Sequence, residues 1–303
     1  MKRALRLLLC LSLFLLFPLF LLKAHLEDLS DQYGAKNYLI DWLNLGWSDR
    51  GIGTHPASSG DKVVVVAKLQ EEHTEWIEEE LPDWERAIYT VNPSHEIAAD
   101  DQQLKTPLNK GHESMVYLTY LIEHYNRLPS TIVFLHAHRP GFLRAWHVDA
   151  PLHEDVWEVR ALQLDFIQEN GYANLRCKLN PGCINHHNDH VTREIFTDIF
   201  EGTSTPPRNH TDVMLTSDQK FLYIPNQIAA ACCAQFAVSR QQVHERPRED
   251  YIKNRQWIID TNLDDAHSGR VMEFLWHMIF GQESVYCPDE EVCYCQVFGQ
   301  CRV

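Results

Sequence analysis

The sequence contains 303 residues, of which 45% are hydrophobic and 11% aromatic, so it can form a substantial core in one large domain or two smaller ones. Its formal net charge of −15 at pH 7 argues against nucleic-acid binding, because phosphate recognition requires a basic face. The same charge is a poor match to an anionic membrane surface. We therefore expect no nucleic-acid partner.

The N-terminal segment 1–24 has the composition of a membrane anchor. Basic residues precede an uninterrupted apolar run, Leu7–Leu22, which is slightly shorter than the about 20 residues of a spanning helix. A cleaved signal peptide is the alternative, but a cut after Ala24 would lack the small residue expected three positions upstream. Because the basic flank is N-terminal, we expect a single-pass type II membrane protein whose main part is lumenal (ER or Golgi) or extracellular.

Residues 25–60 are expected to form a polar stem, and residues 61–303 a single lumenal domain that ends in a cysteine-rich tail, 287–301. The cysteine spacing of the tail, C-x5-C-x-C-x5-C, is not that of a zinc finger, so we expect disulfides in an oxidising compartment. Cys177 and Cys183 lie on either side of a Pro-Gly turn and could close a small loop. A glycosylation sequon at Asn209 agrees with a secretory-pathway protein.

The first part of this domain alternates strand patterns with helix patterns. Lys62–Ala67 is a continuous β-branched run, typical of a strand that is buried on both faces. The predicted elements are strand 62–67, helix 70–81, strand 87–91, helix 113–125 and strand 132–135. This alternation predicts an α/β fold with a mostly parallel sheet flanked by helices.

The second part is predicted to continue with helices and short strands. The predicted elements are helix 156–169, strand 172–177, a helical turn at 195–200, a strand-like segment at 235–238, and helices 247–263 and 268–280. Gly171 is expected to end the first of these helices. The last helix has the clearest apolar stripe, so we expect it to pack on the core.

Histidines follow the predicted strand 132–135 directly. His136 and His138 are two positions apart, so on an extended chain they point the same way and could bind one metal ion. His147 or Asp149 could supply a third ligand. The alternative is that one histidine caps the strand and the others lie on an exposed loop. Because ligand crevices of α/β sheets lie at the carboxyl ends of strands, we expect a site here.

Other candidate residues come from the helices. Glu273 and His277 are four positions apart and share a helix face, although a simple surface pair is the alternative for them. Lys110 precedes one predicted helix and Arg270 opens another, so both could offset the charge of a bound phosphate. Asp149 and Glu273 are candidate catalytic bases.

The chain from about residue 61 to 301 resembles a mainly fungal family catalogued as a domain of unknown function, found behind a single N-terminal anchor. The resemblance is carried in order by VVVVAKLQEEHTEWIEEELPDWERAIYTVN, NKGHESMVYLTYLIEHYNRLPSTIVFLHAHR, AWHVDAP, GYANLRCKLNPGC, AAACCAQFAVSRQQVHERP and SGRVMEFLWHMIFG. The same order is distantly similar to glycosyltransferases of the GT-A type. That likeness implies a GT-A-like (nucleotide-diphospho-sugar transferase-like) fold, a divalent metal and a sugar nucleotide.

The GT-A likeness also implies site residues. In those enzymes an Asp-x-Asp motif at the end of the central strand holds the metal, and His136-Ala-His138 stands at that point here. A late helix often adds a histidine ligand, which His277 would match. Imidazole favours zinc, copper, iron or nickel over magnesium, so the departure from Asp-x-Asp puts magnesium binding in doubt.

Three hypotheses follow. The leading one is a membrane-anchored, glycosyltransferase-like transferase that acts on a small molecule or glycan, with His136 and His138 handling donor phosphate or metal. The second is a histidine-ligated metal enzyme, an oxidase or cyclase acting on a fungal secondary metabolite. The third is a non-catalytic binding protein of the secretory pathway.

Overall fold

The computed structural model describes residues 61–93, 104–138, 147–149, 154–183, 191–200 and 225–301, together with positions 17, 18, 22 and 23. The predicted stem, the sequon at Asn209 and most of the predicted anchor lie outside the described residues. Within the described part, no helix combines the length and apolar character needed to cross a membrane.

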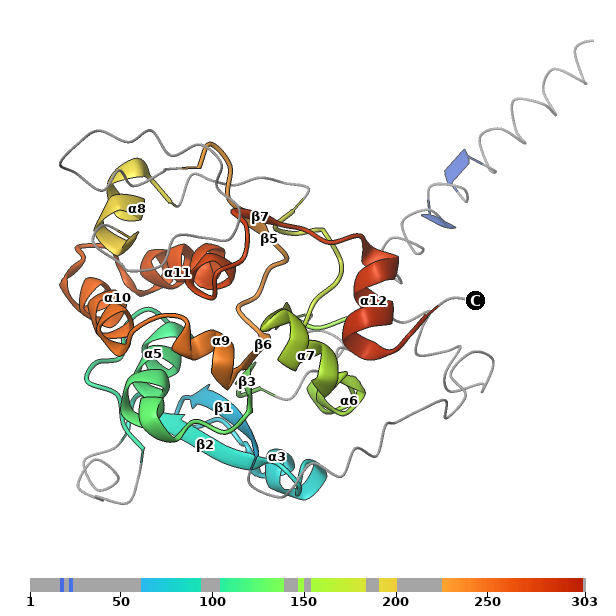
Figure 1. The fold of residues 1–303 in the computed structure, drawn as a ribbon, viewed down its shortest axis with the longest axis horizontal. Helices are drawn as coiled ribbons and strands as arrows, with labels where there is room; N and C mark the ends of the chain where they lie inside the picture. Colours follow the sequence, from blue (N-terminus) through green and yellow to red (C-terminus); the bar gives the residue numbers. More distant parts are fainter. Residues whose placement is uncertain are drawn as a thin grey trace, which may run out of the picture.

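A five-stranded sheet forms the centre of the described fold (Figure 1). The strand order is β2-β1-β3-β6-β4, from β1 (Lys62–Lys68), β2 (Glu85–Thr90), β3 (Thr131–His136), β4 (Tyr172–Asn174) and β6 (Phe236–Ser239). β1 pairs in parallel with both β2 and β3, whereas β6 runs antiparallel to both β3 and β4. The sheet is therefore mixed and mostly parallel, and the predicted α/β class is confirmed.

Helices cover both faces of the sheet (Figure 1). Val63 and Val65 point into one core layer and Val64 and Val66 into the other, as the two-residue period of a strand dictates. The first layer is built with α5 (Glu113–His124), α8 (Arg193–Phe200), α9 (Arg240–His244), α10 (Arg248–Asp260) and α11 (Asp265–Ile279). The second layer is built with α3 (Glu75–Glu80), α6 (Asp155–Ala161), α7 (Leu164–Asn170) and α12 (Glu290–Phe298).

Shorter elements complete the fold. A 3-10 turn, η1 (Tyr125–Arg127), follows α5, and β5 (Ala229–Ala230) pairs in parallel with β7 (Val285–Tyr286). α5 is the most buried helix, because apolar or small residues occupy nearly every position up to Ile122. Through η1, this helix leads the chain into β3.

Several predicted boundaries were wrong for tertiary reasons. The predicted helix 156–169 is broken into α6 and α7, because Leu162 is extended and the Gln163 N–H donates to the Val297 carbonyl of α12. The predicted helix 70–81 starts only at Glu75, since residues 69–72 form a turn in which the Leu69 N–H donates to the Glu72 carboxylate. α12 lies in the cysteine-rich tail, where no helix was predicted.

The predicted disulfides are present, and two of them, Cys177–Cys293 and Cys183–Cys287, connect the tail to the rest of the domain. The bonds are Cys177–Cys293, Cys183–Cys287, Cys232–Cys233 and Cys295–Cys301. The predicted small loop closed by Cys177 and Cys183 was wrong, because the turn between them directs the two side chains to different partners in the tail.

Candidate functional site

The candidate site lies where β1 and β3 end. β2 and β3 lie on opposite sides of β1 in the sheet, so the chain changes direction across the sheet after β2. The carboxyl ends of β1 and β3 therefore flank a topological switch point, which is where α/β sheets bind ligands. Because β6 is antiparallel to β3, the residues that precede β6 arrive at the same edge. Segments distant in the sequence, 69–72, 136–138 and 232–235, therefore meet at this edge.

Three histidines form a cluster at this edge. His136, His138 and His147 each offer a ring nitrogen, and these nitrogens all lie within 4.8 Å of one another. The ring centroids are 4.5 Å apart for His136 and His147, 5.1 Å for His138 and His147, and 5.5 Å for His136 and His138. Such a group is able to share one metal ion. The pair predicted from the sequence is thus brought together, and His147 is the third member.

The surroundings keep His136 neutral and oriented. Its backbone N–H donates to Gln235 Oε1 at 2.7 Å, and Gln235 Nε2 lies 3.5 Å from Asp155 Oδ1. Burial, with the neighbouring His147 and His138, lowers the pKa of His136 well below its ordinary value, while a backbone hydrogen bond to Cys233 opposes that shift. A neutral imidazole held through one ring nitrogen presents the other nitrogen to a metal.

The pKa of His138 is also lowered. Burial lowers its pKa, although the charge of Glu72 acts in the opposite direction. Within the described residues, the Nε2 atoms of His136 and His138 are both buried and make no hydrogen bond. Buried polar atoms normally have a partner, so two such nitrogens that face one cluster point to a ligand.

Two carboxyl groups border the cluster. Glu113 Oε2 lies 4.0 Å from His136 Nε2, and Glu72 Oε1 lies 4.0 Å from His138 Nδ1. Burial, with smaller contributions from the nearby charges of Glu273 and Asp265, raises the pKa of Glu113 to about 8, although a backbone hydrogen bond and the charge of Arg270 act in the opposite direction. Glu113 is therefore a neutral carboxylic acid near pH 7 in this structure, able to hold or give a proton beside the histidines.

Sequence reasoning missed Glu113 and gave Glu72 little weight. Glu113 starts α5 and looks like an ordinary acidic residue in a first helical turn, where the helix dipole favours it. A usable signal was present: the helix behind it is buried over almost its whole length, so a carboxyl at its start is desolvated as well. Gln235 was not visible, because its role depends on the direction of β6.

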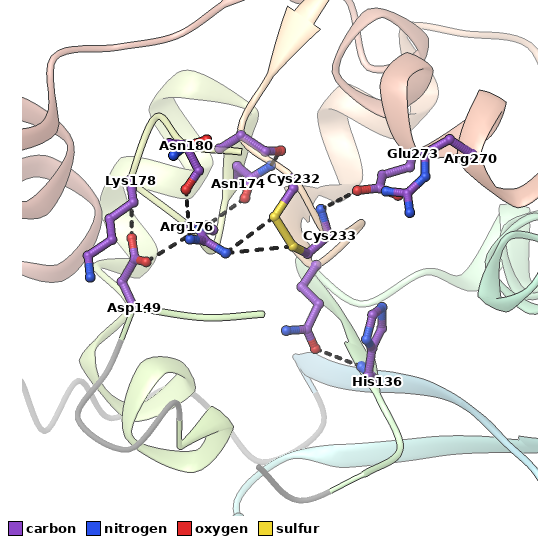
Figure 2. Close-up of a disulfide and its surroundings, with 12 residues drawn as sticks. His136, Asp149, Asn174, Arg176, Lys178, Asn180, Cys232, Cys233, Arg270 and Glu273 are labelled. Atoms are coloured by element: carbon purple, nitrogen blue, oxygen red, sulfur yellow. Dashed lines mark hydrogen bonds and ion pairs between the residues drawn. A yellow bond between two sulfur atoms is a disulfide. The ribbon is translucent and has the colours of Figure 1, made fainter. Parts of the chain in front are cut away.

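Figure 2 shows Glu273 beside Cys233, with Arg270 next to it, in the same region as His136. Glu273 Oε1 accepts the Cys233 N–H at 2.7 Å, and its Oε2 pairs with Arg270 Nη1 at 2.7 Å. Arg270 is half exposed, so it can still contact a ligand. Lys110, in contrast, donates to the carbonyls of Ile259 and Thr261 at the end of α10, which ties it to that helix end.

Asp149 and His277 are placed in structural networks. Asp149 is buried, and its Oδ2 accepts the N–H groups of Cys177 and Lys178 and the Tyr294 hydroxyl. His277 has no exposed surface, and its Nε2 faces the Ser284 carbonyl at 3.1 Å. Burial lowers the pKa of His277 to about 4. The group formed by His136 and His138 contains His147, and His277 lies outside it.

A separate cavity of about 190 Å³ lies between β4, α7 and α12. Its lining includes Phe166, Arg176 and Val297 but none of the three clustered histidines. The lining mixes apolar side chains of the second core layer with polar ones such as Asn170, Asn174 and Gln296. The cavity therefore does not belong to the histidine site.

These features define an α/β protein with a histidine cluster at the carboxyl edge of a mostly parallel sheet. The family model described as "Protein of unknown function (DUF3431)" matches residues 64–296, and the chain belongs to this family. No curated protein and no solved structure matches the chain.

Proposed function

We propose that the protein is a metal-dependent enzyme whose ion is held by His136, His138 and His147. The observation that carries this proposal is the approach of three ring nitrogens within 4.8 Å, beside the two buried Nε2 atoms of His136 and His138, whose pKa values are lowered by desolvation. Imidazole ligands favour zinc, copper, iron or nickel. Such an ion would supply Lewis-acid or redox chemistry at the end of β3.

The chain's own groups then have defined tasks. Glu113 lies next to His136, and burial raises its pKa in the absence of a bound ion, so its carboxyl is placed to exchange a proton with a reacting oxygen or nitrogen. Glu72 faces His138 and supports its orientation. Arg270 lies at the edge of the cluster, half exposed, and can attract an anionic substrate group. A small-molecule or glycan substrate fits this description.

A glycosyltransferase-like transferase is the second candidate. It is supported by the position of the site at the switch point between β1 and β3, where nucleotide ligands of α/β sheets bind. Under this second candidate function, His136 and His138 would hold a metal ion at the donor diphosphate, and Arg270 would offset the negative charge of the diphosphate. An oxidase or cyclase is the reaction class that best fits redox metals. The disulfides favour a secretory-pathway location for either activity.

Metal content and ligand binding test the proposal. The full chain, purified without chelator, should contain about one zinc, copper, iron or nickel ion per molecule by elemental mass spectrometry. The His136→Ala/His138→Ala double variant should lose it. His267→Ala is the matched control, because His267 is an exposed histidine paired with Asp264 on α11. A metal-free wild type, or a double variant that keeps its ion, would sink the proposal.

A binding titration then separates the two enzyme classes. Metal-loaded protein that binds sugar nucleotides supports the transferase. Metal-loaded protein that binds none favours the oxidase or cyclase. If both histidine substitutions leave metal, binding and cellular phenotype unchanged, a non-catalytic binding protein is the better description.

A further inference from the structure

The disulfide between the adjacent residues Cys232 and Cys233 lies beside the histidine cluster but is distinct from it (Figure 2). The Cys233 N–H donates to Glu273, and the Cys233 backbone hydrogen-bonds the His136 ring. Cys232 is buried, whereas Cys233 is partly exposed. An external thiol can therefore approach the Cys233 sulfur more easily than the Cys232 sulfur.

A role in stability does not explain this disulfide. Bridges stabilise mainly by closing long loops in the unfolded chain, and a bridge between neighbours closes none. In addition, Cys233 has φ 90° and Ala234 has φ 49°, a left-handed region that residues with side chains rarely adopt. The turn is thus held in an unfavourable backbone conformation, which suggests a functional reason for it.

A buried cation faces both sulfur atoms. Arg176 Nη1 lies 3.3 Å from Cys232 Sγ and 3.8 Å from Cys233 Sγ. The guanidinium is also held by the Asn180 carbonyl through Nη2 and lies 3.5 Å from Asp149 Oδ1 through Nε. The sulfurs of a disulfide are neutral and accept hydrogen bonds weakly. A thiolate sulfur at the same place is negatively charged and accepts them strongly. Arg176 therefore stabilises the reduced form relative to the disulfide.

Among the described residues, three other charged or titratable side chains lie near the sulfurs. A Glu273 carboxylate oxygen lies within 4.8 Å of both sulfurs and opposes a thiolate there. Arg270 pairs with that carboxylate at 2.7 Å and offsets it. His136 is kept neutral by burial, so it adds no charge. Within the part of the chain that the structure describes, Arg176 is the cation that contacts the sulfurs, and Asp149, behind it, partly balances its charge.

We infer that Cys232–Cys233 is a redox-active disulfide that exchanges with a dithiol reductant. A thiolate of the dithiol attacks Cys233 Sγ, the S–S bond breaks, and Cys232 Sγ leaves as a thiolate beside Arg176. The second thiolate of the dithiol then closes its own disulfide and releases Cys233, which takes up one proton. Two electrons enter the protein, the dithiol becomes a cyclic disulfide, and its second proton goes to solvent.

A redox titration of the full chain tests this inference. Protein is equilibrated with mixtures of oxidised and reduced dithiothreitol, quenched in acid, alkylated, and analysed peptide by peptide. We compare the ratio of reduced to oxidised dithiothreitol at which half of each disulfide is reduced. For Cys232–Cys233 this ratio should be at least tenfold lower than for Cys177–Cys293 or Cys183–Cys287. Arg176→Met should raise the ratio needed by about tenfold, and Arg176→Lys should restore it in part. Arg160→Met is the matched control, because Arg160 bonds only the exposed Glu80 carbonyl among the contacts described.

A second measurement needs no variant. In the reduced wild type, we measure the rate of Cys232 alkylation as a function of pH. The pH at which this rate is half its maximum should lie at least one unit below the pKa of an ordinary thiol, which is about 8.5. The inference is overturned if Cys232–Cys233 opens together with or after the long-range disulfides, or if reduced Cys232 titrates like an ordinary thiol. These readouts do not depend on metal, so they stay separate from the test of the proposed enzyme.

Discussion

At the scale of single residues, His277 shows how burial changes the chemistry of a side chain. Its ring is completely enclosed beneath α11 and faces the Ser284 carbonyl, and burial lowers its pKa from 6.5 to about 4. The folded protein therefore binds a proton at His277 less readily than the unfolded chain does. Stability from this residue is fully present above pH 6.5 and is lost as the pH falls toward 4.

We expect His277→Gln to reduce this pH dependence. Gln retains an N–H that can donate to Ser284 but has no group to protonate. Between pH 7 and pH 4 the wild type should lose about 3 kcal/mol more unfolding free energy than the variant. Urea unfolding at a series of pH values measures the difference. Parallel curves for wild type and variant would show that His277 does not titrate as described.

Asp149 is a second residue whose role the structure clarifies. It was predicted as a catalytic base, yet its carboxylate receives two backbone N–H groups and the Tyr294 hydroxyl, and it lies beside the buried Arg176. Asp149→Ala would leave these donors without their acceptor and would remove the carboxylate beside the buried Arg176 guanidinium. The expected loss of stability is about 3–5 kcal/mol. Thermal unfolding measures it, with Asp260→Ala as a surface control, and a loss below about 1 kcal/mol would contradict the structural role.

The candidate site was only partly predictable. His136 and His138 were visible because they follow a strong strand pattern at two-residue spacing. His147 was one of two alternatives, since the residues that carry it back to the cluster have no periodic pattern. His277 was suggested by the GT-A likeness, but the helix pattern cannot say which face of α11 turns toward β3. Cys232 and Cys233 were visible as cysteines, but their pairing was not.

At the scale of elements, the disulfides differ in what they contribute. Cys177–Cys293 attaches α12 to the second core layer over a sequence separation of 116, while Cys295–Cys301 closes a separation of 6 within the tail. Because Cys183–Cys287 stays closed in both variants, the first bridge closes only the about 12 residues between the two pairs in the unfolded chain; by the entropy of loop closure, replacing it by serine should cost about 3 kcal/mol and replacing the second pair about 2 kcal/mol. Thermal unfolding under non-reducing conditions compares the two variants. Equal losses would mean that loop closure does not set their contributions.

The elements themselves were predicted where a pattern is strong over many residues. β1, β3, α5, α10 and α11 all lie within a few residues of their predicted bounds. The break between α6 and α7 was not predictable, because it depends on a hydrogen bond from Gln163 to α12, at the far end of the sequence. α12 was hidden by its cysteines, which dominate the composition of a short helix.

At the scale of the whole molecule, metal binding should stabilise the fold. A ligand present at about 100 times its Kd adds about 2.7 kcal/mol to the unfolding free energy. For a domain of this size that raises Tm by about 5–10 °C. We expect this shift for wild type with zinc, copper, iron or nickel, but not for His136→Ala/His138→Ala. Differential scanning fluorimetry measures the Tm with and without metal. A similar rise in Tm for the wild type and the double variant would mean that the ion binds outside the histidine cluster.

The fold class was predictable as a whole because alternating strands and helices leave few arrangements for a sheet. The direction of β6 was not predictable. A short apolar segment fits a sheet equally well in either direction, and β6 contributes only Phe236–Ser239. That direction decides which residues reach the site, so the largest gap in the prediction lay in one short strand.

The position of β6 also has a consequence for the order of synthesis. β3 gains β1 as a neighbour early, but its other neighbour is β6, and the contact from His136 to Gln235 spans 99 positions. While the ribosome makes the intervening chain, one edge of β3 has no partner strand and its apolar residues are incompletely covered. Exposed strand edges invite pairing with other chains. The nascent protein therefore passes through a stage at which this strand edge is open to chaperones and to other chains.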